Sequence, residues 1–131
     1  ADAMWGYRGE RGGRDWTWAG KWAARADDVL SWLPARLTAL LIAMPTVGHS
    51  WRAVIANAGL TPSPNGGWPM GALAVGLGIR LGKPGVYELN PQGRAPLATD
   101  TVLALCCCGR VVALLATLAA AVVVVVVGGL A

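Results

Sequence analysis

The sequence predicts a mostly α-helical portion of an integral membrane protein, with amphipathic or interfacial helices, a loop rich in proline and glycine, and a C-terminal transmembrane helix. Three observations support this fold class. Hydrophobic residues make up 55% of the 131 residues and charged residues only 14%, whereas about 25% are charged in an ordinary soluble domain. Residues 111–131 carry no charge. Apolar residues recur at helical spacing within residues 17–33, which is typical of an amphipathic helix.

Two regions follow from this distribution. We expect residues 1–110 to form a region that is largely cytoplasmic or at the membrane interface, and residues 111–131 to form a transmembrane helix. A chain of this length has room for one small domain at most. Because it begins at Ala1 rather than Met, we expect it to be the C-terminal part of a larger protein or a natural truncation.

The charge distribution narrows the choice of partners. The net charge is +4, and all eleven lysines and arginines lie at or before Arg110. A basic excess suits anionic lipid, phosphorylated small molecules or nucleic acid. The arginines are dispersed singly and no nucleic-acid-binding module is recognisable. We therefore expect membrane lipid, and no nucleic acid, as a partner.

The three cysteines, Cys106, Cys107 and Cys108, are adjacent, so their side chains point in different directions on a helix. They supply neither the CxxC pairs nor the partner histidines of a zinc site. We expect no structural metal and interpret these cysteines as small apolar packing residues.

The first predicted helix covers residues 17–33. Tryptophans opposite Lys and Arg favour the lipid headgroup zone, so this helix either lies in the membrane interface or turns an ordinary apolar stripe toward a core. The residues of its apolar face are Trp18, Trp22, Ala26, Val29 and Leu33.

Residues 37–47 form a second apolar run, which is too short to span a bilayer and is interrupted by Pro45. This run predicts a partial, re-entrant or strongly kinked membrane segment. A short helix is expected next, capped by Ser50 and ended by Gly59.

Residues 61–69 carry three prolines and two glycines, which forbid regular structure. We expect a shaped loop that presents a hydroxyl, a carboxamide, an indole and bare backbone amides to a polar ligand. The alternative is a plain connector between two helices. Residues 70–81 then predict a helix of small residues that lets another helix approach closely. Residues 82–96, with three prolines and three glycines, predict a loop.

The C-terminal segment is long enough to cross about 30 Å of hydrocarbon as a helix. Its six consecutive valines favour a strand in water, but a lone segment in lipid must satisfy its own backbone hydrogen bonds. Arg94 and Arg110 precede it and no basic residue follows. The positive-inside rule therefore places the C-terminus outside and the bulk of the chain in the cytoplasm.

Four segments in matching order and separation resemble the cobalamin-biosynthesis family known as adenosylcobinamide-phosphate synthase. They are DAMWGYR at residues 2–8, ARADD at 24–28 with WLPARLT at 32–38, TPSPNGGWP at 61–69, and GIRLGKPGVY at 78–87. The resemblance ends near Asn90. Because members of this family are considerably longer, it implies that the complete protein crosses the cell membrane several times.

The resemblance implies an amide-forming (C–N) ligase that converts adenosylcobyric acid to adenosylcobinamide phosphate. Joining a corrin propionate carboxyl to aminopropanol phosphate requires an activated carboxyl and a deprotonated amine, which implies ATP and Mg²⁺. The expected partners are then a corrinoid, an amino-alcohol phosphate and other cobalamin-assembly enzymes. The alternative is a non-catalytic membrane scaffold or a degenerate remnant of the family.

Candidate site residues lie in the matching segments. Consecutive aspartates diverge by roughly 100° on a helix, so we expect only one of Asp27 and Asp28 to face a site, where it is available to bind Mg²⁺ or an amine. Arg36 lies beside an apolar run, where an unpaired cation is costly. The expected catalytic residues are Asn65, Arg36, Asp27 and Asp28. The expected substrate-binding residues are Arg8, Tyr7, Ser63, Gly66, Gly67, Trp68, Arg80 and Tyr87.

Each of these residues also has a plain structural alternative, as a solvated charge or a loop anchor. Two departures from the family pattern concern the same segments. Met70 stands where many relatives carry glutamate, which removes a candidate general base, and Ser31 replaces the usual asparagine before Trp32.

Overall fold

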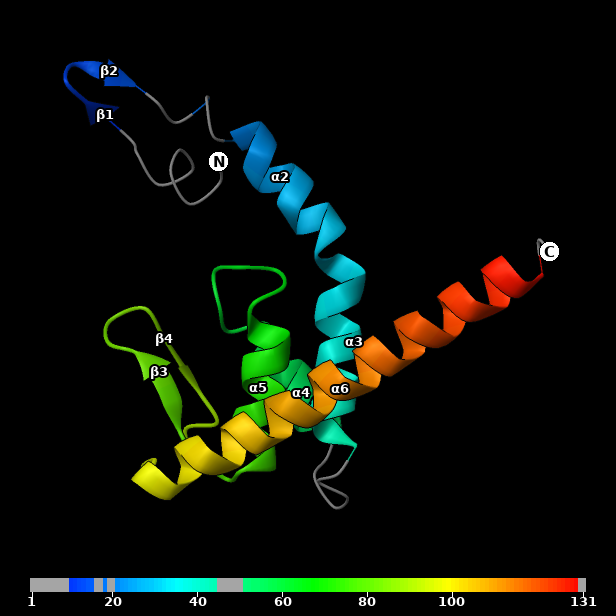
Figure 1. Cartoon of the computed structure of the whole chain (residues 1–131). Coiled ribbons are helices and arrows are strands. Elements are labelled where there is room, and N and C mark those ends of the chain that lie inside the picture. The colour runs from blue at the N-terminus through cyan, green and yellow to red at the C-terminus, as the bar shows by residue number, and fades with distance from the viewer. Residues whose placement is uncertain (1–9, 16–17, 19–20, 45–50, 130–131) are drawn as a thin grey trace.

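The computed structural model describes residues 10–15, 18, 21–44 and 51–129, and helices dominate these residues (Figure 1). The mostly helical fold class and the long apolar C-terminal helix are confirmed there. In chain order the elements are β1 (Glu10–Arg11), β2 (Arg14–Asp15), α2 (Lys21–Leu30), α3 (Trp32–Ala43), α4 (Trp51–Ala58), α5 (Gly67–Gly76), β3 (Leu81–Lys83), β4 (Tyr87–Leu89) and α6 (Ala98–Gly128).

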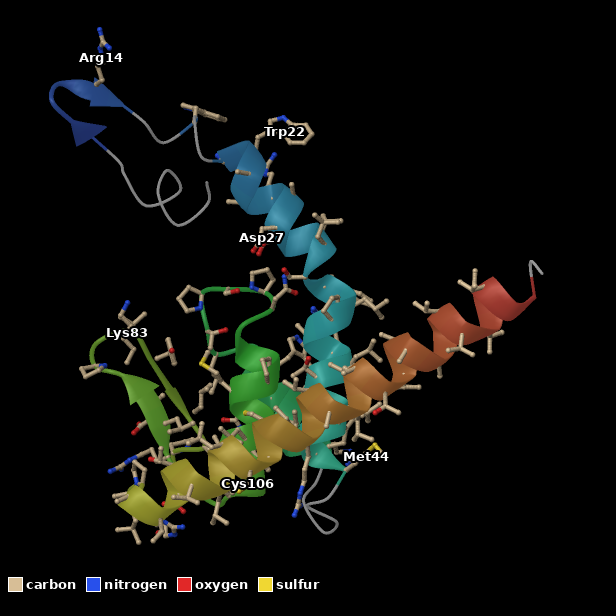
Figure 2. The ribbon with its side chains drawn as sticks, viewed as in Figure 1. Arg14, Trp22, Asp27, Met44, Lys83 and Cys106 are labelled. Atoms are coloured by element: carbon tan, nitrogen blue, oxygen red, sulfur yellow. The ribbon has the colours of Figure 1, made fainter. Side chains whose placement is uncertain are left out.

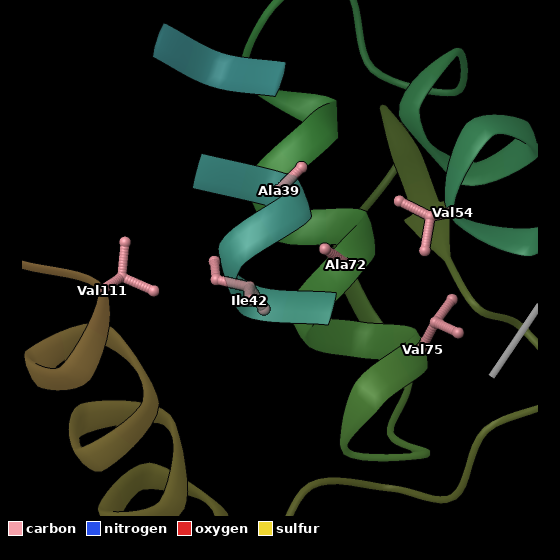
Figure 3. Close-up of a cluster of buried hydrophobic side chains, with 6 residues drawn as sticks. All are labelled: Ala39, Ile42, Val54, Ala72, Val75 and Val111. Carbon is pink, nitrogen blue, oxygen red and sulfur yellow. The ribbon is translucent and has the colours of Figure 1, made fainter. Parts of the chain in front are cut away.

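Helix α5 is the centre of the fold. It packs against α3 and α4, and α6 crosses α3 (Figure 1). The buried core is a small aliphatic cluster to which all four of these helices contribute (Figure 3). Its members are Ala39 and Ile42 of α3, Val54 of α4, Ala72 and Val75 of α5, and Val111 of α6.

Small side chains let α5 approach its neighbours closely, as the sequence predicts. Ala72 and Ala74 are 1% and 0% exposed. A Cβ added to Gly71 would lie 3.2 Å from the Cβ of Asn57 on α4. Close backbone approach therefore replaces large side chains in packing this helix.

The predicted boundaries of this helix are wrong at both ends, because α5 begins at Gly67 and ends at Gly76. Gly78 lies beyond its end with φ of +62°. An L side chain is strained in that conformation. Gly78 is thus required by a turn and takes no part in helix packing.

The helix predicted at residues 17–33 is divided in two. α2 begins at Lys21, Ser31 lies in a turn, and α3 begins at Trp32. Pro34 is accommodated in the first turn of α3, because first-turn N–H groups have no partner inside the helix. No side chain of α2 is buried. Among the described residues, no core packs against the face of α2 that carries the tryptophan. The location of α2 in the membrane interface stays a prediction.

The apolar run at residues 37–47 belongs to α3 as far as Ala43. Met44 follows as the C-cap of α3. Residues 45–47 and the predicted capping residue Ser50 lie outside the described residues, so the re-entrant membrane segment stays a prediction. The short helix predicted before Gly59 is present as α4.

The loop predicted at residues 61–69 is shorter than expected. Residues 61–66 are irregular, but Gly67, Trp68 and Pro69 form the first turn of α5. A proline in a first turn removes no intrahelical hydrogen bond. The prediction that these residues exclude regular structure is therefore wrong for the last three positions.

The loop predicted at residues 82–96 is also wrong in part, because a β-hairpin occupies its start. β3 pairs antiparallel with β4, with Gly82 opposite Glu88. Gly85, with φ of +72°, forms the tight turn between the strands. Leu89 of β4 is fully buried and anchors the hairpin to the helices.

Two asparagines fasten the end of this hairpin. The backbone N–H of Asn90 donates to Oδ1 of Asn57 at 2.5 Å, and Nδ2 of Asn57 donates to the carbonyl of Ala53 at 2.8 Å. Nδ2 of Asn90 donates to the carbonyls of Ala74 and Ile79 at 3.1 and 3.0 Å. Because Asn57 is only 8% exposed, these partners are what make its burial tolerable.

Helix α6 begins at Ala98, before the predicted start at residue 111. Asp100 holds its first turn and is 3% exposed. The carboxylate accepts two hydrogen bonds from the Arg94 guanidinium and one from the Leu97 N–H, each 2.7 Å long. These bonds satisfy a free N–H at the helix start and place a negative charge at the positive end of the helix dipole. The hydrogen bond to Asp100 raises the pKa of Arg94.

Beyond Val111 the described residues of α6 are exposed, and the helix projects away from the other elements (Figure 1). It is long and apolar enough to cross a membrane. Cys107 packs against the core, whereas Cys106 and Cys108 are exposed. The boundary predicted after residue 110 falls inside α6, while the sidedness and the number of spans stay predictions.

Candidate functional site

A groove lies between the α2–α3 turn and the loop that leads into α5. Its volume is about 370 Å³, and its walls include the hydroxyls of Ser31 and Thr38. Asp27 projects from α2 toward this loop (Figure 2). The groove thus brings together four predicted site residues from two distant segments: Asp27, Ser63, Asn65 and Gly66.

Arg36 holds the loop against α3. Its Nη1 donates to Oδ1 of Asn65 at 2.6 Å and to the carbonyl of Trp32 at 2.9 Å, and Nη2 donates to the carbonyl of Pro64 at 3.3 Å. The guanidinium carbon lies 4.5 and 4.7 Å from the ring centroids of Trp32 and Trp68, a favourable cation–π distance. All of these partners are neutral, and no carboxylate among the described residues forms an ion pair with Arg36.

Asn65 is the buried member of the groove, at 6% exposure. While Oδ1 accepts from Arg36, Nδ2 donates to the backbone carbonyl of Asp28 at 2.7 Å. One side chain thereby ties the loop to both α2 and α3. A carboxamide nitrogen carries two hydrogens, and among the described residues one of those of Asn65 has a partner, the Asp28 carbonyl.

The hydroxyl of Ser63 organises the tip of the loop. Its oxygen accepts the backbone N–H of Asn65 at 3.3 Å and that of Gly66 at 3.1 Å. The Gly66 amide, which the sequence suggested was open to a ligand, therefore already has a partner. Because a hydroxyl can accept and donate at once, the Ser63 O–H remains a donor at the groove.

Gly67 and Trp68 are packing residues of α5 and do not line the groove. A Cβ on Gly67 would overlap the carbonyl of Ala58 and lie 2.6 Å from Oγ1 of Thr61. The Trp68 ring lies 6.2 Å from that of Trp51 and packs against the core. These contacts agree with the structural alternative for Trp68, namely a residue that anchors its loop.

Asp27 and Asp28 diverge as expected for neighbours on a helix. Asp27 lines the groove and accepts a long hydrogen bond of 3.5 Å from Ser31. Asp28 is not part of the groove wall, but its backbone carbonyl is the acceptor for Asn65. Of the two aspartates, Asp27 is therefore the one placed to meet a ligand.

Arg80 and Tyr87 lie elsewhere, at a second hollow of about 400 Å³ on the hairpin. This hairpin hollow shares no lining residue with the groove. Arg80 forms an exposed ion pair with Glu88 at 3.2 Å. Tyr87 donates its hydroxyl to the sulfur of Met70 at 3.9 Å.

Met70 lies between the two hollows. Its sulfur contacts Tyr87 on the hairpin, and its methyl group would lie 3.7 Å from a Cβ built on Gly66. The residue that departs from the family pattern is thus the side chain that bridges the groove loop and the hairpin.

Tyr7 and Arg8 lie outside the described residues. Sequence reasoning missed the residues that fix the hairpin and α6, namely Asn57, Asn90, Arg94 and Asp100. An asparagine with φ of +48° at position 90 could have been suspected from the LNP turn, because asparagine tolerates that region better than other side chains. The pairing of Asn57 with Asn90 depends on tertiary structure and left no local signal.

The resemblance implies ATP and Mg²⁺, and the groove residues fit Mg²⁺ better than ATP. Mg²⁺ prefers oxygen ligands, often one or two carboxylates with several waters, and the Asp27 carboxylate with the hydroxyls of Ser31 and Ser63 offers that donor set. A polyphosphate does not fit the described groove, because no basic side chain lines it. The described residues include no group of three or more His, Cys, Asp and Glu that could hold a metal ion.

The fold and groove define a class: a small helical unit with a groove between its helices and a loop, and with one helix able to cross a membrane. A family model described as "CobD/Cbib protein" matches residues 1–105. The chain belongs to this CobD/Cbib family.

Curated relatives agree with this assignment. The chain is 41% identical over 107 residues to the "Probable cobalamin biosynthesis protein CobD" of Methanothrix thermoacetophila, covering 79% of this chain and 33% of that protein. It is 41% identical over 107 residues to the "Cobalamin biosynthesis protein CobD" of Dehalococcoides mccartyi, covering 77% and 33%. For the Chromobacterium violaceum protein of that name the identity is 44% over 99 residues, covering 73% and 30%.

The chain therefore spans about a third of the length of the curated relatives it matches. No solved structure matches it.

Proposed function

We propose that this chain acts in cobalamin biosynthesis, as part of an enzyme that forms an amide between a carboxyl of a corrinoid and an amino-alcohol phosphate. The relatives that match most of this chain are named for that pathway. One observation carries the proposal furthest: the Arg36–Asn65 hydrogen bond joins two of the four segments that resemble the synthase family and holds Asn65 in the wall of the groove.

The groove offers a distinct role to each polar group in this chemistry. The amine would attack a corrinoid carboxyl activated by ATP as an acyl phosphate, so that the C–N bond forms while the C–O bond to phosphate breaks and inorganic phosphate leaves. The Asp27 carboxylate would hold the amine and accept its proton. The Ser63 hydroxyl and the remaining N–H of Asn65 would donate to the carbonyl oxygen of the activated corrinoid carboxyl, where negative charge develops. Arg36 would act as a positioning residue, because its hydrogen bonds are spent within the protein.

Mg²⁺ is the alternative occupant of the Asp27 carboxylate: Asp27, Ser31 and Ser63 would hold it, and it would supply neutralisation of negative charge on the substrates. ATP binding would need basic groups from outside the groove. Membrane attachment through α6 and a cytoplasmic groove complete the proposal.

A chimera tests this function directly. The Methanothrix relative would receive this chain in place of its matching third, and membranes would be supplied with adenosylcobyric acid, aminopropanol phosphate and ATP. We expect adenosylcobinamide phosphate to be formed. A folded chimera without product, beside an active parent protein, would contradict the proposal.

Two matched variants separate an enzyme from a non-catalytic scaffold. Asp27→Asn removes the groove carboxylate, whereas Asp28→Asn changes a neighbour that is not part of the groove wall. We expect the first to lower product formation by about a hundredfold or more, since general acid–base groups contribute about 10²–10⁴-fold. The second should have little effect. Equal activity of both variants and of the unaltered chimera would favour the scaffold.

A further inference from the structure

Helices α3 and α6 enclose a crevice of about 310 Å³, which we call the α3–α6 crevice. It shares no lining residue with the groove or with the hairpin hollow, so it takes no part in the chemistry proposed above. Residues about one turn apart on each helix form its walls. They are Leu41 and Met44 of α3, and Cys107, Arg110, Val111 and Leu114 of α6.

The crevice has a buried floor and an open apolar rim. Val111 is 5% exposed and lies opposite Ile42 in the aliphatic cluster (Figure 3). On the rim, Met44 and Leu114 are 61% and 50% exposed. The described residues therefore leave an apolar surface uncovered between the two helices. An unbranched methionine at the rim can adapt to the shape of an apolar ligand.

Arg110 is the charged member of this otherwise apolar set. Among the described residues, no carboxylate forms an ion pair with it and no hydrogen bond of its guanidinium is found. Residues 45–50, which follow Met44 in the chain, contain no aspartate or glutamate. Because a cation without a partner is costly beside apolar surface in a membrane, the crevice favours a ligand that brings an anion.

The position of Arg110 on α6 matches the depth of phosphate groups in a bilayer. It is the last charged residue of the helix, and residues 111–128 are uncharged. At about 1.5 Å per residue those residues rise about 27 Å, close to the hydrocarbon thickness of about 30 Å. When α6 crosses a membrane, Arg110 thus lies at the headgroup level, and Leu114 lies one turn deeper, in the hydrocarbon.

We propose that the α3–α6 crevice binds one anionic phospholipid, of which phosphatidylglycerol is the simplest example. The Arg110 guanidinium holds the phosphate in charge-assisted hydrogen bonds, and an acyl chain lies along the apolar side chains of Leu114 and Met44. Basic pockets between membrane helices bind anionic headgroups in this way. The single positive charge of the crevice matches the single negative charge of phosphatidylglycerol, whereas phosphatidylcholine has no net charge.

A phospholipid fits the crevice better than a further helix does. The lipid brings an anion and an apolar chain in the order in which the crevice presents Arg110 and Leu114. A helix would cover the apolar side chains, but it would leave the guanidinium without an anion unless it also carried a carboxylate.

The experiment measures lipid binding by native mass spectrometry, with the full chain in a nonionic detergent. The probes are phosphatidylglycerol and phosphatidylcholine with the same acyl chains, and sn-glycerol 3-phosphate, which has a phosphate but no acyl chain. We expect phosphatidylglycerol to bind about fivefold more tightly than phosphatidylcholine, as expected for one basic residue at an anionic headgroup. The chain-free phosphate should bind more weakly than either lipid. Equal binding of the two lipids overturns the proposal.

Three variants test the assigned contacts. Arg110→Gln should abolish the preference for phosphatidylglycerol and leave the binding of phosphatidylcholine unchanged. Lys83→Gln, on the hairpin (Figure 2), removes the same charge outside the crevice and should keep the preference. Met44→Gln is similar in length but polar, so it should weaken both lipids alike. A preference that survives in Arg110→Gln, or that is lost as fully in Lys83→Gln, would contradict the assignment.

The adjacent cysteines report where the lipid binds. Cys107 lines the crevice, whereas Cys106 and Cys108 are exposed and do not line it. Replacing Cys106 and Cys108 by alanine keeps only the Cys107 thiol, and replacing Cys107 and Cys108 keeps only the Cys106 thiol. Phosphatidylglycerol should slow alkylation of Cys107 by N-ethylmaleimide and leave alkylation of Cys106 unchanged. Equal slowing of both thiols would show that lipid coats the helix without entering the crevice, which overturns the proposal.

The longer chimera separates a lipid from a protein segment as the occupant. In vesicles, Cys107 of the chimera should react more slowly with phosphatidylglycerol than with phosphatidylcholine as the lipid. A Cys107 thiol that is protected equally in both would mean that another segment of the longer protein fills the crevice, and the proposal would fall. This readout does not depend on product formation, so its outcome is independent of the proposed function.

Discussion

Nη1 of Arg36 donates a 2.6 Å hydrogen bond to Oδ1 of Asn65, twenty-nine positions further along the chain. The bond fixes the groove loop to α3 and aligns Nδ2 of Asn65 with the carbonyl of Asp28 on α2. Two residues expected to act on substrate thus satisfy each other. In the structure, their main role is to hold α2, α3 and the groove loop together.

Replacing Arg36 tests this task. Arg36→Met should lower the free energy of unfolding by about 1–3 kcal/mol, because the buried Asn65 oxygen loses its donor. Arg36→Lys should recover only part of this loss, since one ammonium cannot reach all three acceptors with the geometry of a guanidinium. Thermal unfolding in detergent measures the effect, with exposed Arg52→Lys as control. An Arg36→Lys variant as stable as the original chain would show that the fork geometry is unimportant.

Adjacent glycines offer a test of packing in the same loop. Gly67→Ala should destabilise the protein by about 1–3 kcal/mol, because the new Cβ overlaps the Ala58 carbonyl and the neighbouring backbone must shift. Gly66→Ala is the matched control, since its Cβ would meet Ser63 Oγ at an ordinary 3.5 Å. Chemical denaturation compares the two. Similar denaturation midpoints for the two variants would mean that the first turn of α5 shifts to accommodate the new Cβ without loss of stability.

The Asn57–Asn90 contact predicts a stability effect at the end of the hairpin. Asn57→Ala leaves the Asn90 N–H without its acceptor. The expected cost is about 1–3 kcal/mol of unfolding free energy. Hydrogen exchange should show faster exchange of the Asn90 amide and of the β4 amides. Unchanged exchange at residue 90 would indicate that another acceptor takes over.

Asp100 predicts local opening at the start of α6. Asp100→Asn removes the charge that Arg94 binds in two hydrogen bonds, although the amide oxygen can still accept one. We expect a lower melting temperature and faster hydrogen exchange over residues 97–101. Exposed Thr101→Ala, in the same turn, serves as the control. A variant whose exchange matches the original there would show that the ion pair does not hold the helix start.

Met70 predicts a gain of function in the chimera described above. Met70→Glu would place a carboxylate between the groove and the Tyr87 hydroxyl, where the resemblance to the synthase family predicts one. We expect product formation to rise by about tenfold or more, within the range of a general base. Met70→Gln is similar in shape but cannot accept a proton. Equal rates for the two variants would exclude a base role at this position.

Particular residues show how much of the fold could be predicted from the sequence. Helical spacing and small residues predicted α4 and most of α5, and the uncharged C-terminal segment predicted the exposed half of α6. Prolines were misleading, since Pro69 lies inside the first turn of α5 and Pro84 lies in the turn of a β-hairpin. Proline restricts its own φ and removes one donor, so its effect depends on whether that donor was needed.

The sequence by itself determined the helical class, the apolar C-terminal helix and the segments that carry polar candidates, because periodicity, charge content and motif order are local properties of the chain. Tertiary structure decided which candidates meet. It gathered Asp27, Ser63 and Asn65 in one groove and placed Arg80 and Tyr87 at another hollow. It also used Arg36 to brace the loop. Such pairings depend on contacts between distant segments, whose geometry is set only when the helices pack.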